Sequence, residues 1–217
     1  NEVHKQAMNV LAGVFSVELA TTHSTGSTFA GGTINTDGIL TAKQKLGDNQ
    51  DQLTIALLNS KVYQDALRDG IITNNVFGVS AEQFRSGMIG QMLGMNPVMT
   101  DKLTATSSVY PSYFAAPGAM IYKFRNRPVS IQSNANITRV NANGIIADIE
   151  LYRNPTTGGG QDILIMRYSA VTHVPGVQYD GSGTANNPTN AQLATAANWT
   201  KVATDDKLIK IVELKTL

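Results

Sequence analysis

The amino-acid sequence predicts an α+β protein in which a long helix, a compact mixed α/β part and long antiparallel strands follow one another. Three observations lead to this class. Apolar residues recur every three or four positions in 2–19, which is the period of one helical face. Residues 53–70 are typical of a buried strand followed by a helix. Residues 145–174 are typical of two long antiparallel strands joined by a Gly-rich connection, and such strands favour an elongated arm over a compact pocket.

The first half of the chain supports the mixed α/β part. A helix is expected over 37–51, with Asp37 as its cap. The apolar run at 53–58 predicts a buried strand. Asn59 or Ser60 would cap the next helix, which ends at a glycine.

From Met88 onward the sequence is rich in strand signals. Turn pairs such as Pro117-Gly118 separate short runs of apolar and β-branched residues. A short Ala-rich helix is expected to follow Asn187-Pro188 and to reach about Asn198. We expect strands at 88–93, 97–100, 110–116, 119–124, 128–132, 145–152, 162–174 and 207–214.

Length and composition exclude several classes of protein. The chain has 217 residues, 42% of them hydrophobic and 15% charged, and its formal net charge is +1. A chain of this length can bury a hydrophobic core without disulfides or metal ions to hold it together. The net charge near zero argues against binding nucleic acid through the electrostatic field of the whole protein. The low charge and the hydrophobic content argue against a disordered chain. Without cysteine there is no disulfide framework or thiol nucleophile. No apolar run reaches the roughly 20 residues of a membrane helix.

No residue pattern typical of catalysis, cofactor binding or metal binding is present. His4, His23 and His173 are far apart in the sequence and lack neighbours at metal-ligand spacing. Strand-like residues follow Gly158–Gly160, so these glycines predict a turn rather than a phosphate loop. Neighbouring residues on a strand point to opposite faces, which makes Asp205-Asp206 a poor acid/base pair. An enzyme whose groups meet only on folding is a third hypothesis, which no motif supports.

Two patterns allow both a binding and a packing interpretation. Basic and aromatic residues alternate from Tyr122 to Arg127, as in proteins that bind single-stranded nucleic acid, but a half-buried strand gives the same pattern and is favoured. Trp199, the only tryptophan, is interpreted as either a core anchor or an interface hot spot, with the core favoured.

Six segments in order carry a resemblance to one family. They are LAGVF at 11–15, LTIALLNSKVYQDALRDGII at 53–72, MIGQMLGMNPVMTD at 88–101, YPSYFAAPGAMIY at 110–122, IELYRNPTTGGGQDILIMRYSAVTHVPGV at 149–177, and NPTNAQLATAANW at 187–199 followed by IKIVEL at 209–214. In this order the segments resemble the major capsid proteins of tailed bacteriophages that have the HK97-like fold.

The resemblance implies a long spine helix, a long antiparallel β arm and a compact mixed α/β central domain. It assigns the spine helix and its connection to 1–37 and the long β hairpin to 136–185, both in a peripheral domain. It assigns 38–135 and 186–217 to a central domain. The family's N-terminal arm and extended loop have no counterpart ahead of Asn1, so we interpret the chain as truncated or processed. No cross-linking or catalytic residue is carried over from the family.

The resemblance further implies a structural subunit of a phage or prophage capsid. Such subunits form rings of five and six, which close into an icosahedral shell around double-stranded DNA. The expected partners are copies of the chain, portal or scaffold proteins, and packaged DNA close to the shell without specific binding. No membrane partner is expected. The subunit is expected in the host cytoplasm before assembly and in the virion afterwards. The candidate subunit-interface residues are Trp199, Tyr110, Tyr113, Arg125, Arg127, Asn187, Pro188, Arg153 and Arg167.

A binding module is the alternative from a different class. Its long strands, low charge and Thr/Asn-rich surface would suit a carbohydrate binder or a cell-surface adhesin. Such a module needs aromatic side chains on a flat exposed face, and aromatic residues make up only 6% of the chain.

Overall fold

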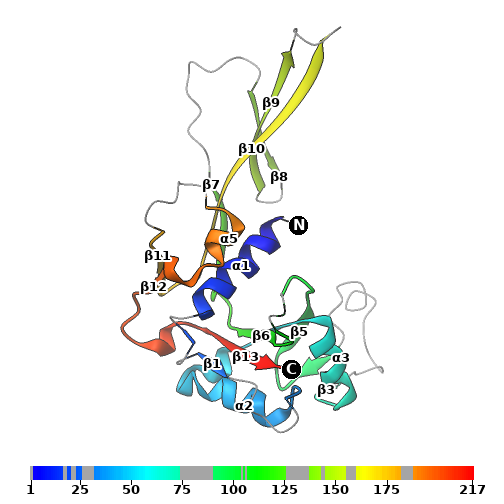
Figure 1. The fold of residues 1–217 in the computed structure, drawn as a ribbon, viewed down its shortest axis with the longest axis vertical. Coiled ribbons are helices and arrows are strands. Elements are labelled where there is room, and N and C mark those ends of the chain that lie inside the picture. Colours follow the sequence, from blue (N-terminus) through cyan, green and yellow to red (C-terminus); the bar gives the residue numbers. More distant parts are fainter. Residues whose placement is uncertain are drawn as a thin grey trace. The chain divides into compact units, whose positions relative to one another are not determined.

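The computed structural model describes most of the chain (Figure 1). It forms two compact units, which are described separately: unit 1 comprises residues up to Met120 and from His173 onward, and unit 2 comprises Ile121–Thr172. The described helices all lie in unit 1, whereas both units contain sheets, so the predicted mixed α+β class is confirmed. The described residues are 2–16, 19–20, 23–25, 32–73, 90–103, 105, 107–125, 137–142, 145–154, 160–181 and 188–217.

The described elements follow in chain order. The α-helices are α1 (Glu2–Ser16), α2 (Thr36–Gln44), α3 (Ser60–Arg68) and α5 (Asn190–Leu193), and the 3-10 helices are η1 (Gly47–Gln52), η2 (Ala196–Asn198) and η3 (Asp206–Leu208). The strands are β1 (Ser24–Thr25), β2 (Ile55–Leu58), β3 (Ile72–Thr73), β4 (Gln91–Met92), β5 (Asn96–Met99), β6 (Tyr110–Ala115), β7 (Ile121–Arg125), β8 (Ile137–Ala142), β9 (Ile145–Asn154), β10 (Gln161–His173), β11 (Val177–Tyr179), β12 (Trp199–Lys201) and β13 (Ile211–Thr216).

Unit 1 is built around a five-stranded sheet with the order β1-β13-β6-β2-β5. β13 runs antiparallel to β6 and parallel to β1, and β2 runs antiparallel to β6 and parallel to β5. The sheet thus brings together strands from both ends of the sequence. Two further pairs, β11 with β12 and β3 with β4, complete the described strands of this unit.

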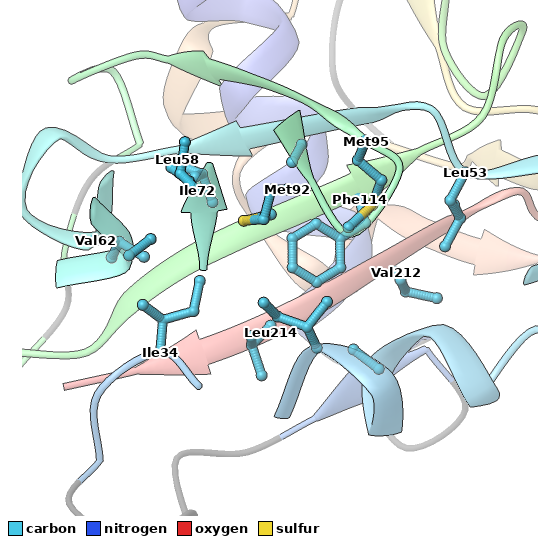
Figure 2. Close-up of a cluster of buried hydrophobic side chains, with 14 of the residues drawn as sticks. Ile34, Leu53, Leu58, Val62, Ile72, Met92, Met95, Phe114, Val212 and Leu214 are labelled. Atoms are coloured by element: carbon cyan, nitrogen blue, oxygen red, sulfur yellow. The ribbon is translucent and has the colours of Figure 1, made fainter. Parts of the chain in front are cut away.

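The sheet separates two hydrophobic cores. Phe114 of β6 and Val212 and Leu214 of β13 belong to the first core, which side chains of α2 and α3 cover (Figure 2). Successive residues of a strand point to opposite faces, so Tyr113 and Ile211 enter the second core instead. That core is closed by α1.

The apolar stripe predicted at 2–19 is confirmed as the buried face of α1. Val10, Leu11, Val14 and Phe15 are each at most 1% exposed, and the helix ends at Ser16. Because these side chains pack with α5 and β12 residues, α1 belongs to unit 1. The domain division at 37/38, 135/136 and 185/186 stays a prediction.

The expected single helix over 37–51 is wrong in its extent. Asn35 rather than Asp37 caps α2, and its side chain accepts a hydrogen bond from the Gly38 N–H. The helix stops at Gln44, and a 3-10 turn begins at Gly47, which adopts a φ of +53°. This left-handed conformation interrupts a regular α-helix and suits glycine.

The helix expected after residue 58 is confirmed as α3. The Asn59 side chain caps it by accepting from the Lys61 N–H, and Gly70 follows it with a φ of +67°. The helix expected to reach Asn198 is wrong in its extent, because α5 ends at Leu193. Thr195 is extended, and Trp199 begins strand β12 instead of ending a helix.

Unit 2 contains a four-stranded sheet with the order β7-β10-β9-β8. The antiparallel pair expected at 145–174 is observed as β9 and β10, in register from Gln161 opposite Asn154 to Tyr168 opposite Ala147. β8, which had no strand prediction, pairs with the other edge of β9. The strand predicted at 128–132 lies outside the described residues.

Candidate subunit-interface residues

Trp199 is buried within unit 1, with 3% of its surface exposed. Its indole Nε1 donates a hydrogen bond to the Leu193 carbonyl oxygen at 2.8 Å. Its ring contacts those of Tyr179 and His173, at centroid distances of 5.0 and 6.3 Å. Of the two interpretations of this residue, the structure supports the core anchor, because so little of the side chain is available to a neighbouring subunit.

Gly13 allows α1 to lie directly against this tryptophan. A Cβ atom at Gly13 would stand 2.2 Å from the Leu193 carbonyl oxygen and 2.6 Å from the Trp199 Nε1. Both distances are below van der Waals contact, so a side chain there requires α1, α5 or Trp199 to shift. Sequence reasoning missed this role, although a glycine inside a predicted helix was an available signal.

Tyr113 is also an interior residue rather than a surface contact. It is 2% exposed, and its ring packs on Phe15 at a centroid distance of 5.2 Å. Burial raises the pKa of its hydroxyl well above the usual range, and the negative charge of Glu213 and a hydrogen bond to that carboxylate raise it further. Glu213, 3% exposed, also accepts from the Ser24 Oγ at 2.7 Å and pairs with the Lys215 Nζ at 3.3 Å.

A half-open cavity of about 470 Å³ lies beside this carboxylate in unit 1. It is lined by Met8, Asn9, Ala12, Phe15, Ser16, Lys102, Leu103, Val109, Pro111, Tyr113, Ala194, Glu213 and Lys215. Glu213 is the only carboxylate in this lining, so the cavity lacks a pair of acids for acid/base chemistry. Among the described residues, no group of three or more His, Asp or Glu side chains is placed to hold a metal ion.

Tyr110 and Pro188 are half-buried on unit 1. The Lys61 Nζ lies 4.9 Å from the centre of the Tyr110 ring, a cation–π contact. Pro188 directly precedes Thr189, which caps α5 through a reciprocal capping box. Two further candidates, Arg127 and Asn187, lie outside the described residues.

The remaining candidate arginines belong to unit 2. Arg167 pairs with Glu150 across β10 and β9. Arg153 and Asp162 stand 4.0 Å apart, with side chains 71% and 66% exposed. Arg125 is exposed on β7.

The basic and aromatic residues of β7 behave as a half-buried strand. Lys123 and Arg125 are exposed, whereas Tyr122 and Phe124 are half-buried. Tyr122 meets Phe124 edge-on at 5.2 Å, and Phe124 meets Tyr168 edge-on at 6.0 Å. These rings contact one another instead of forming a flat exposed platform, so the strand interpretation is the one that the structure supports.

Sequence reasoning missed a group of exposed apolar side chains on β9 and β10. Leu151, Leu164 and Met166 are 54%, 68% and 56% exposed. The available signal was the alternation in this hairpin, which places large apolar residues on both faces of a ribbon.

No described helix is long and apolar enough to cross a membrane.

Comparison with known families assigns the chain. The family described as major capsid protein 13-like matches residues 2–209. The chain belongs to this family. The resemblance to phage major capsid proteins is thereby confirmed, and so is the expectation of a structural rather than an enzymatic protein.

One curated relative and one solved structure are also similar to the chain. The major capsid protein of Bacillus phage SPP1 is 27% identical over 216 residues, which are 99% of this chain and 60% of that protein. The chain therefore spans about three-fifths of the length of that relative. The holo-SrpI encapsulin complex from Synechococcus elongatus PCC 7942 is similar with a TM-score of 0.48 and 10% identity, over 98% of this chain and 61% of the encapsulin chain. The assignment rests on the family match.

Proposed function

We propose that this capsid-family chain is the shell-forming part of a phage or prophage capsid subunit with the HK97-like fold. Copies of it would form rings of five and six, which close into an icosahedral shell around double-stranded DNA. The observation that carries the proposal is the family match, because it extends over residues 2–209 and includes both units.

The charge and packing of the chain are suited to repeated contacts between identical copies. A formal charge of +1 limits the repulsion that accumulates when many copies meet. Unit 1 has two closed cores that keep its shape, and unit 2 presents apolar side chains on an exposed sheet. Contacts that repeat by rotation close into rings when the rotation closes.

The finer assignments belong to the full-length protein. In this proposal α1 is the spine helix, β9 and β10 form the arm of a peripheral domain, and the large sheet of unit 1 is the central domain. Portal or scaffold proteins and packaged DNA are its further partners. The subunit passes from the host cytoplasm into the virion.

Electron microscopy and sedimentation velocity test the proposal. We expect the expressed chain, and a longer version extended to the length of its relative, to form rings, tubes or shells under assembly conditions. A longer version that stays monomeric over a range of salt and protein concentrations would overturn the assignment to the shell.

A further inference from the structure

One face of the sheet in unit 2 is apolar and exposed. Directly paired residues of antiparallel strands share a face. The register pairs Leu164 with Leu151, Met166 with Ile149 and Tyr168 with Ala147, and we call the surface formed by these six residues the apolar face. Its four largest exposed members, Leu164, Met166, Leu151 and Tyr168, are 68%, 56%, 54% and 39% exposed.

The opposite face of the ribbon formed by β9 and β10 carries Ile163, Ile165 and Tyr152 together with charged residues that are paired within the chain. Arg139 donates from Nε to the Asp148 carboxylate at 2.8 Å, which raises the pKa of this arginine. Arg167 pairs with Glu150 on the same face. These charges therefore have partners already. On the apolar face Tyr168 meets Phe124 of β7 edge-on at 6.0 Å, whereas Leu151, Leu164 and Met166 are each more than half exposed.

The register makes the apolar face complementary to itself. Consider two copies whose apolar faces are stacked on each other. A two-fold axis lies between the two faces and runs parallel to the strands, midway between β9 and β10. β9 of each copy then lies over β10 of the other, and each residue meets the copy of its own cross-strand partner. Leu151 meets Leu164, and Ile149 meets Met166. At the end of the ribbon Arg153 meets Asp162, which carries the opposite charge.

We propose that the apolar face is a contact between two copies of this chain, related by a two-fold axis along the ribbon. The inference rests on the proposed shell function for the presence of a second copy, and it adds which surface meets which. Two features select a second copy as the occupant: apolar pairs meet apolar pairs, and unlike charges meet at the end. Soluble monomers rarely expose a contiguous apolar patch of this kind, and sheets commonly stack face to face with nearly aligned strands.

Disulfide trapping between two differently tagged chains tests the axis. The chain has no cysteine, so introduced cysteines are the only thiols. One chain carries Leu151→Cys and the other Leu164→Cys, and the two are mixed under assembly conditions and oxidised. Because residue 151 of one copy faces residue 164 of the other, we expect mixed disulfide dimers at least several-fold above the dimers that each variant forms alone.

A matched pair on the opposite face provides the control. Tyr152 and Ile163 are also directly paired, one position along from the test residues, and therefore point the other way. A mixture of Tyr152→Cys and Ile163→Cys chains should give only background dimers. Equal yields from both mixtures, or self-dimers as abundant as mixed dimers, would overturn the proposed contact.

A charge substitution gives a second readout that does not depend on disulfide chemistry. Met166→Glu should weaken self-association by about tenfold or more in sedimentation velocity. The control is Val171→Glu, at a residue that is 51% exposed on the same strand. It lies an odd number of positions from Met166, so we expect it to point to the opposite face of the sheet. This substitution should leave self-association within about twofold of the original chain. Equal effects of the two substitutions would contradict the inference.

Electron microscopy of the same samples separates the two proposals. Shells or rings without the mixed dimers would leave the shell function standing and remove this contact. Mixed dimers in a protein that forms no larger assembly would support the contact and count against the shell function.

Discussion

At the scale of single residues, α1 lies directly against Trp199 at Gly13. The indole donates to the Leu193 carbonyl, and Gly13 leaves the space that the indole and this carbonyl occupy. Gly13 is far in the sequence from Leu193 and Trp199, which are only six residues apart. The residue type alone allows Trp199 to be either a core anchor or an interface residue. The residues that surround it in the folded chain decide between these two roles.

We expect Gly13→Ala to destabilise the chain by about 1–3 kcal/mol, because the added methyl group overlaps a backbone carbonyl that cannot rotate away. The higher helix propensity of alanine offsets part of this cost. Chemical denaturation measures the difference. Ser16→Ala on an exposed position of the same helix is the control and should stay within about 0.5 kcal/mol. A Gly13→Ala chain as stable as the original would refute the close approach.

His23 makes the stability of unit 1 depend on pH. It is fully buried, and its Nε2 lies 2.8 Å from the Asp206 carbonyl oxygen and 3.1 Å from that of Ile209. Burial lowers the pKa of the imidazole, and the charge of Lys201 acts in the same direction, against the opposing effects of these carbonyls and the Asp206 carboxylate. The neutral ring is therefore the form that the fold favours.

The unfolded chain consequently binds a proton at a higher pH than the folded chain does. As the pH falls below about 6.5, His23 should reduce the free energy of unfolding until the pH passes its lowered pKa. Denaturation between pH 7 and 5 should show a shallower loss for His23→Gln than for the original chain. Identical slopes would show that this imidazole is not linked to folding.

At the scale of elements, Asn59 performs two tasks at the start of α3. Its side-chain oxygen accepts from the Lys61 N–H at 3.0 Å, and its amide donates to the Leu103 carbonyl at 3.2 Å. Asn59→Ala should cost about 1–2 kcal/mol. Asn59→Ser keeps a cap acceptor and should lose less, and the exposed Gln64→Ala is the control. An equal loss from Ser and Ala would assign the whole effect to the Leu103 contact.

Elements with local signals were predicted well from the sequence. The helix after Asn59, the strand over 53–58 and the turn at Pro117-Gly118 each carry a cap, an apolar run or a turn residue, and all three are observed. The helices expected over 37–51 and to Asn198 failed because Gly47 and Thr195 leave helical geometry. The start of β12 depends on β11, a distant partner strand, and no local pattern encodes that pairing.

The candidate site was less predictable than the fold for a related reason. An aromatic or basic residue in a turn-rich segment suits an interface and a core equally well. Trp199 and Tyr113 proved to be interior, whereas the exposed apolar side chains lie on β9 and β10, where no candidate had been named for its apolar character. Which face of a long ribbon stays uncovered depends on what packs against it, and the sequence of one chain does not contain its neighbours.

At the scale of the whole molecule, the two units differ in how much they bury. Unit 1 has two cores of fully buried side chains, whereas Ala147 and Asp148 are the buried residues among those described in unit 2. In the isolated chain, we expect backbone amides of β8, β9 and β10 to exchange with solvent faster than those of β6 and β13. Hydrogen exchange read by mass spectrometry measures this.

Assembly should slow the hydrogen exchange of the unit 2 amides. If copies cover the ribbon, its amides gain protection in assembled particles, while those of β6 and β13 change little. Ribbon amides as protected as the β6 amides in the isolated chain would contradict the difference in burial. Unchanged protection after assembly would show that the ribbon stays uncovered.

The position of β13 in the large sheet also governs when the subunit can fold during synthesis. β13 lies between β1 and β6, and it supplies Val212 and Leu214 to one core and Ile211 to the other. The ribosome makes β1, β6 and α1 long before this strand. Neither core is complete until β13 leaves the exit tunnel, so a nascent chain has no finished subunit surface to offer. Contacts between subunits that depend on either core are thus delayed until β13 has been synthesised.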